Sequence, residues 1–93
     1  MIVRIDTHIL DSGQYGYTVS ARGDELYSDS GLSSIVHCMA AAVEGFGEEL
    51  KAAEFACRGI VSGTYTLHTL ATKPGTVAQH AVNTANAVYA AEH

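Results

Sequence analysis

The 93-residue chain is poor in charged residues, and above all in lysine. Charged residues make up 16% of it, lysine occurs only at positions 51 and 73, and tryptophan is absent. A typical domain has about 25% charged residues. The net charge at pH 7 is −5. Proteins that bind nucleic acid or anionic membranes without sequence preference rely on an excess of lysine and arginine, so we expect neither kind of direct binding.

The chain also lacks a long apolar run and closely paired cysteines. No apolar segment approaches the roughly 20 residues that span a bilayer. Cys38 and Cys57 are too far apart for a short zinc or redox motif, so we expect two buried thiols, no metal and no cofactor. The first residues enter an alternating segment without the basic and then apolar layout of a signal peptide, which predicts a cytoplasmic protein.

The hydrophobic share of 47% predicts a folded chain, and the length predicts one domain over residues 1–93. Alternation of apolar and polar residues predicts strands in two hairpins. Turns are expected at Asp11–Gln14, at Arg22–Glu25 and at Ser62-Gly63. The expected strands are 2–10, 15–22, a short one at 25–28, and two more at 54–61 and 64–69.

Two helices are expected, one after each hairpin. Asp29-Ser30-Gly31 offers capping oxygens ahead of an apolar stripe that runs from Leu32 to Phe46, and Gly45 or Gly47 is expected to end this helix in the left-handed conformation. Residues 48–53 are ambiguous between helix and strand. Pro74 suits the first turn of a last helix that continues to Glu92. The order of these strands and helices predicts an α+β two-layer sandwich, ββ(β)αββα, with two helices on one face of an antiparallel or mixed sheet of about five strands.

The uncovered face of this sheet is the predicted binding face. In the first strand, Arg4, Asp6 and His8 alternate with apolar residues and therefore point to one side. Later strands repeat the pattern. Arginine suits such a face because its planar fork makes paired hydrogen bonds. The predicted binding face comprises Arg4, Asp6, His8, Arg22, Glu54, Arg58, Thr66 and His68.

An enzymatic alternative uses Asp6, His8 and His68. An aspartate two residues from a histidine on one strand can orient the imidazole as a base, and His68 would act as a second acid–base group of a small hydrolase or lyase. This alternative requires the three side chains to converge in a concave pocket. The same residues are not clustered closely enough in the sequence to predict a zinc site.

The last helix carries no formal charge between Lys73 and Glu92. A surface helix normally has charged residues on its solvated side, so this one is expected to pack against a second copy of the chain. The predicted homodimer interface consists of Val82, Asn83, Asn86 and Tyr89. An ordinary one-sided helix with an uncharged polar face is the alternative.

The sequence therefore predicts a small acidic, dimeric, cytoplasmic protein-interaction module that binds a protein partner and is not an enzyme. Acidic pairs at Asp24-Glu25 and Glu48-Glu49 leave a second possibility, an inhibitor that blocks the basic groove of a nucleic-acid-handling or defence enzyme. Residues 16–20 and the alanine-rich helix after them resemble the start of HicB-like antitoxin modules, which opens with a hairpin, a short third strand and a helix. The resemblance covers about the first half of the chain, departs from the pattern at the second hairpin and carries no functional residue across.

Overall fold

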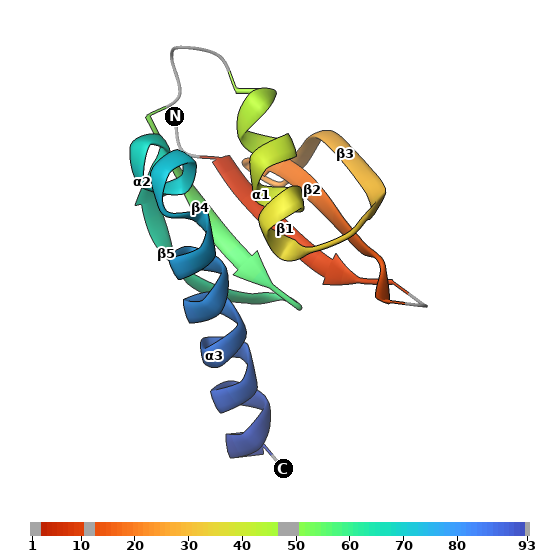
Figure 1. Ribbon diagram of the computed structural model, residues 1–93, viewed down its shortest axis with the longest axis vertical. Helices are drawn as coiled ribbons and strands as arrows, with labels where there is room; N and C mark the ends of the chain where they lie inside the picture. Colours follow the sequence, from red (N-terminus) through yellow and green to blue (C-terminus); the bar gives the residue numbers. More distant parts are fainter. Residues whose placement is uncertain (1–2, 11–12, 47–50, 93) are drawn as a thin grey trace.

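The computed structural model describes residues 3–10, 13–46 and 51–92 (Figure 1). Five strands form one sheet, and three helices lie on one side of it. This confirms the expected α+β class with a mixed sheet, and adds a short helix. The elements are β1 (Val3–Ile9), β2 (Tyr15–Ala21), β3 (Asp24–Leu32), α1 (Ile35–Glu44), β4 (Ala52–Cys57), β5 (Ile60–Thr66), α2 (Leu67–Thr72) and α3 (Pro74–Glu92).

The strand order is β3-β2-β1-β4-β5, which places the first strand at the centre and leaves β3 and β5 at the edges. β1 pairs antiparallel with β2 and parallel with β4, while the other neighbours are antiparallel. A parallel partner needs a crossover connection, and α1 supplies it between β3 and β4. Among the described residues, no helix is long and apolar enough to cross a membrane.

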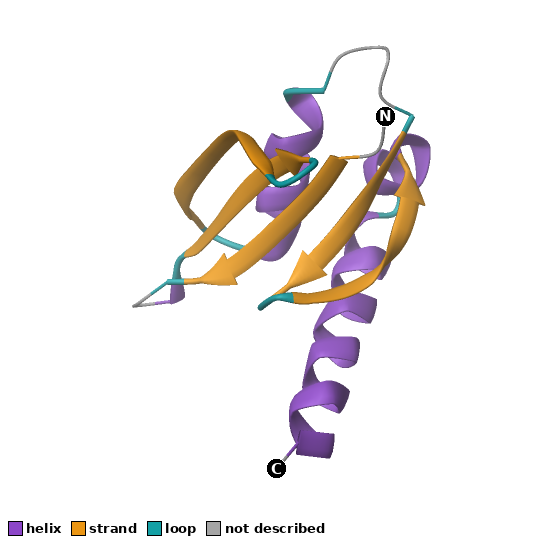
Figure 2. Cartoon of the chain, turned by 180° about the vertical axis from the view of Figure 1, so that it is seen from behind, coloured by secondary structure: helices purple, strands orange, loops and turns teal. Residues whose placement is uncertain are grey.

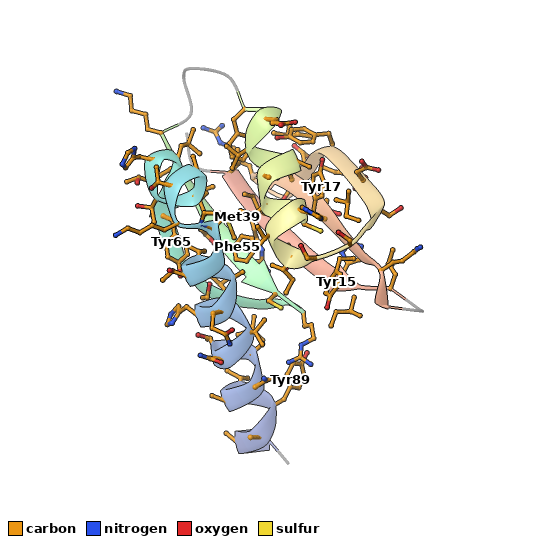
Figure 3. All side chains as sticks on the ribbon, viewed as in Figure 1. Tyr15, Tyr17, Met39, Phe55, Tyr65 and Tyr89 are labelled. Atoms are coloured by element: carbon orange, nitrogen blue, oxygen red, sulfur yellow. The ribbon has the colours of Figure 1, made fainter. Side chains whose placement is uncertain are left out.

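The core lies between the sheet and the helices. On β1 the buried residues are Val3, Ile5 and Thr7, as the alternating pattern predicts. The Thr7 hydroxyl donates to the carbonyl oxygen of Ala56 at 2.9 Å, so this buried polar group is satisfied. Met39 of α1 and Phe55 of β4 are fully buried in this layer (Figure 3).

The β2–β3 and β4–β5 hairpins each turn on an arginine followed by a glycine. The pairs Ala21–Asp24 and Cys57–Ile60 leave Arg22-Gly23 and Arg58-Gly59 as the central turn residues. Their φ angles are 54° and 85° in the first turn and 52° and 82° in the second. Two positive φ angles define the type I′ turn, whose twist matches that of the flanking strands.

The first of these turns confirms the sequence prediction, and the second corrects it. Ser62-Gly63 is not a turn but lies inside β5, where Phe55 pairs with Gly63 and Ala56 with Val61. Ser62 is thus the extra residue of a bulge, and its hydroxyl donates to the Phe55 carbonyl at 3.2 Å.

The boundaries of α1 also differ from expectation. β3 continues to Leu32, through the residues predicted to cap the helix, and Ser34 caps it instead by accepting from the His37 amide at 3.1 Å. Gly45 follows the helix with φ −80°, so the predicted left-handed ending is wrong there. A Cβ at Gly45 would lie 2.6 Å from the Tyr27 ring, which explains the glycine by close packing. Gly47 and residues 48–50 lie outside the described residues.

Candidate binding face

The face of the sheet opposite the helices is uncovered, as Figure 2 shows. We call it the open face. In the sheet register, Arg4 lies between Ser20 of β2 and Glu54 of β4, and Asp6 lies next to Thr18 of β2. Because paired residues point to the same side, these side chains share the open face. The sequence prediction of a polar, uncovered face is therefore correct for the central strands.

A hollow of about 400 Å³ lies at one end of the open face. Four predicted binding-face residues meet there: Arg4, Asp6, Arg22 and Glu54. The described residues that line it are Val3, Arg4, Asp6, Ser20, Arg22, Gly23 and Glu54.

Arg4 and Asp6 hold each other in place across this hollow. The Nε of Arg4 donates to Asp6 Oδ1 at 2.9 Å, and a second guanidinium nitrogen lies 2.9 Å from the same oxygen. The two side chains are 39% and 32% exposed, so solvent screens the pair and its contribution to stability is small. Its effect is to fix the orientation of one positive and one negative group.

Arg22 and Glu54 differ from this pair. Within the described parts of the chain, neither side chain makes a hydrogen bond or an ion pair. Arg22 is exposed, and its backbone is left-handed. The hollow therefore presents a cation and a carboxylate that remain available for contacts outside the chain.

Arg58 is not on the open face, contrary to the sequence prediction. Its guanidinium donates to Asn86 Oδ1 at 2.6 Å and lies 5.0 Å from the centre of the Tyr89 ring. The Tyr89 hydroxyl in turn donates to the Arg58 carbonyl at 3.0 Å. The alternation of a strand does not extend into a type I′ turn, and at Arg58 the contacts with Asn86 and Tyr89 hold the side chain against α3 on the helix side.

The prediction is wrong for His68 but not for the position of Thr66, which pairs with Ala52 in phase with Glu54 and therefore lies on the side of the open face. The strand ends at Thr66, whose hydroxyl accepts from the Thr69 amide at 3.1 Å and caps α2. His68 therefore lies on a helix. The strand periodicity assumed for His68 fails because Thr66, a residue type that favours strands, is equally suited to a helix cap and ends the strand before His68.

The proposed catalytic residues do not converge. Asp6 lines the hollow, whereas His8 lies further along β1, on the open face beside Gly16, and His68 is on α2. Neither histidine lines the hollow. In the described ranges, no group of three or more His, Cys, Asp or Glu side chains is arranged to hold a metal ion.

Both cysteines are free thiols in the core, which confirms that part of the prediction. Burial, and after it the charge of Asp29, raises the pKa of the Cys38 thiol. A thiol with a raised pKa is a poor nucleophile because the thiolate is the reactive form.

The predicted dimer residues on α3 have contacts within the chain. Val82 is half-buried against the core, and Asn86 and Tyr89 bind Arg58 as described above. Asn83 is exposed and accepts a hydrogen bond from Gln79 at 3.0 Å. The side of α3 that carries these residues is thus partly occupied.

Sequence reasoning missed a second hollow, of about 460 Å³, between β5, α2 and α3. It is mostly apolar, with Tyr65 and Val77 in its wall and Lys73 and His80 beside them. The residues of the described ranges that line it are Ser62, Gly63, Tyr65, Thr69, Lys73, Thr76, Val77 and His80. A signal was present in the sequence, since the lack of formal charge noted for the last helix extends back to Gly59 with the exception of Lys73.

No family model, curated protein or solved structure matches this chain.

Proposed function

We propose that the chain is a non-enzymatic protein-interaction module that binds a protein partner through the hollow on the open face. The observation that supports this proposal most directly is the backbone conformation of Arg22 together with the lack of partners for its side chain within the described chain. This residue has a left-handed backbone, lines the hollow and has no hydrogen-bonding or charged partner among the described residues.

A left-handed conformation costs a residue with a Cβ about 1–2 kcal/mol, and asparagine or glycine is the usual choice in a type I′ turn. At Arg58 the same cost is offset by the contacts with Asn86 and Tyr89. At Arg22 no such contact within the described chain offsets it. An unfavourable backbone conformation that no contact within the described chain offsets is typical of a functional residue. This favours a contact between Arg22 and another molecule.

The charges of the hollow define the chemistry of the partner. Arg22 can bind a carboxylate through its planar fork, while Glu54 can accept from a lysine or arginine. The fixed Arg4–Asp6 pair contributes one group of each sign. A surface with interspersed charges of both signs matches a protein, whereas the two carboxylates disfavour a nucleic-acid backbone.

The composition of the hollow supports binding over catalysis. Among the described residues that line it, Ser20 alone carries a hydroxyl and none is a histidine or a cysteine. A serine nucleophile needs an adjacent base, and Asp6 is engaged by Arg4.

The two arginine turns provide a matched test. Tagged wild-type protein, Arg22→Asn and Arg58→Asn would be used to capture proteins from an extract of the organism that carries the gene. We expect a partner that binds the wild type and Arg58→Asn alike, and binds Arg22→Asn about tenfold more weakly, because truncating an arginine anchor typically costs more than 1 kcal/mol. Equal capture by all three proteins, equal loss in both variants, or no captured partner would contradict the proposal.

One observation favours the inhibitor as a second candidate. Asp24, Glu25 and Asp29 all lie exposed on the edge strand β3, so three carboxylates gather along one edge. A basic partner bound there would be released by salt. Its binding would be weakened by Glu25→Lys and unaffected by Arg22→Asn, which separates this candidate from the first.

A further inference from the structure

The two edges of the sheet have opposite characters. β3 carries Asp24, Glu25 and Asp29, and its pairing with β2 is interrupted by two register shifts. Charges and bulges are the features by which natural proteins prevent an edge strand from pairing with another molecule. β5, with the sequence Ile-Val-Ser-Gly-Thr-Tyr-Thr, has one bulge, no charged residue and no proline. Its edge is therefore the less protected of the two.

The uncharged edge continues into an uncharged helix. Of the chain's fifteen charged residues, only Lys73 falls within residues 59–91, which include β5, α2 and nearly all of α3. The hollow lined by Tyr65, Thr76 and His80 lies between strand and helix, so the two elements meet on the same side of the molecule. Figure 3 shows Tyr65 on this side, where β5 lies next to α2.

We propose that β5 pairs antiparallel with β5 of a second copy of this chain, across a two-fold axis perpendicular to the sheet. The two five-stranded sheets would then join into one continuous sheet. The same axis places the two α3 helices beside each other in one layer, with the hollow of each copy covered by the other. The part of α3 that faces the partner is the side of Thr76, His80 and Ala87, rather than the side of Asn86 and Tyr89.

Charge favours a second copy as the occupant. Two copies with a net charge of −5 each repel one another wherever their acidic surfaces meet. Contact through residues 59–91 keeps the carboxylates of β3 at the far ends of the joined sheet. A two-fold contact brings the same patch of both copies together, and a patch with almost no charge does not repel its own copy. Strand and helix together also offer more surface than a strand edge alone, and a stable interface needs above about 1,000 Å².

The dimer leaves the open face of each copy accessible and fixes how the two open faces are oriented. Because the axis is perpendicular to the sheet, both open faces lie on the same side of the joined sheet. A partner with repeated binding sites would be held by both copies at once. This consequence, unlike the dimer itself, rests on the proposed function.

The test is the solution mass by light scattering at two widely separated protein concentrations. We expect wild type near twice 9.8 kDa at the higher concentration. Val61→Lys/Thr64→Lys places two lysines on exposed positions of β5, so four would meet across the axis, and we expect a mass of 9.8 kDa. The matched control, Leu26→Lys/Ser28→Lys, adds the same charge to exposed positions of β3 and should remain dimeric.

A wild type that stays monomeric at both concentrations would overturn the proposal, as would a β5 variant that remains dimeric or a β3 control that dissociates. Circular dichroism shows whether each variant is folded. Hydrogen exchange of the wild type supplies a test without any substitution, since half of the β5 amides face outward and should exchange more slowly as the protein concentration rises. Exchange in β5 that is independent of concentration would count against the dimer even if the variants failed to fold.

Discussion

Replacing Arg22 by asparagine should stabilise the fold. Arg22 has φ 54° in a type I′ turn, a conformation that costs most residues about 1–2 kcal/mol and that asparagine adopts readily. The arginine side chain has no hydrogen bond or ion pair among the described residues, so little is lost on its removal. We therefore expect Arg22→Asn to raise the free energy of unfolding by about 1 kcal/mol. For a domain of this size that is a rise in Tm of about 4–8 °C.

The same change at Arg58 should have no such benefit. Its turn is equally left-handed, but Arg58→Asn also removes the hydrogen bond to Asn86, worth about 0.5–1.5 kcal/mol, and the contact with the Tyr89 ring, worth about 0.5–1 kcal/mol. Gain and loss cancel to within about 1 kcal/mol. Urea unfolding of the two variants beside wild type measures the difference. A destabilised Arg22→Asn, or an Arg58→Asn of equal or greater stability than Arg22→Asn, would refute the reasoning that sets Arg22 apart.

Two further predictions concern the packing of α1 on β3. Gly45→Ala should destabilise the protein by about 1–3 kcal/mol in urea unfolding, because the new Cβ would lie 2.6 Å from the Tyr27 ring. The control is Gly75→Ala near the start of α3, which has open space around it and should be neutral or stabilising. Equal effects of the two substitutions on stability would contradict this account. Burial, and after it Tyr17, raises the pKa of Tyr27 to about 12, while the unfolded chain releases this proton near pH 10. Stability should therefore fall as the pH rises from about 10 to 12, and less steeply in Tyr27→Phe. An unchanged slope of stability against pH in Tyr27→Phe would show that Tyr27 is not the source of this pH dependence.

Much of the fold could be predicted because local patterns and burial agree. The alternation in β1 reports directly which residues face the helices, and Pro74 marks the start of α3. The parallel pairing of β1 with β4 could not be predicted, since it joins segments about fifty residues apart and no local pattern reports strand order. This pairing brings Glu54 beside Arg4 and so adds a carboxylate to the lining of the hollow.

The errors in the candidate site have a common cause. Arg58 and His68 were assigned by extending the two-residue period of a strand beyond the point where the strand ends. Arginine is an unusual first residue of a type I′ turn, and Thr66 suits both a strand and a helix cap, so neither boundary is evident from composition. Arg4, Asp6 and Glu54 lie within their strands, where the period holds, and the structure brings them together.

The most direct test of the open face as a binding surface is site-specific photo-crosslinking in extract of the organism that carries the gene. A photoreactive residue at Thr18, beside Asp6 in the middle of the open face, would be compared with one at the exposed Asn83 of α3. We predict a crosslink to a different protein from Thr18 whose yield falls strongly when Arg22→Asn is added, and no such adduct from Asn83. A Thr18 probe that captures nothing, or an adduct whose yield is unchanged by Arg22→Asn, would contradict the assignment of function to this face.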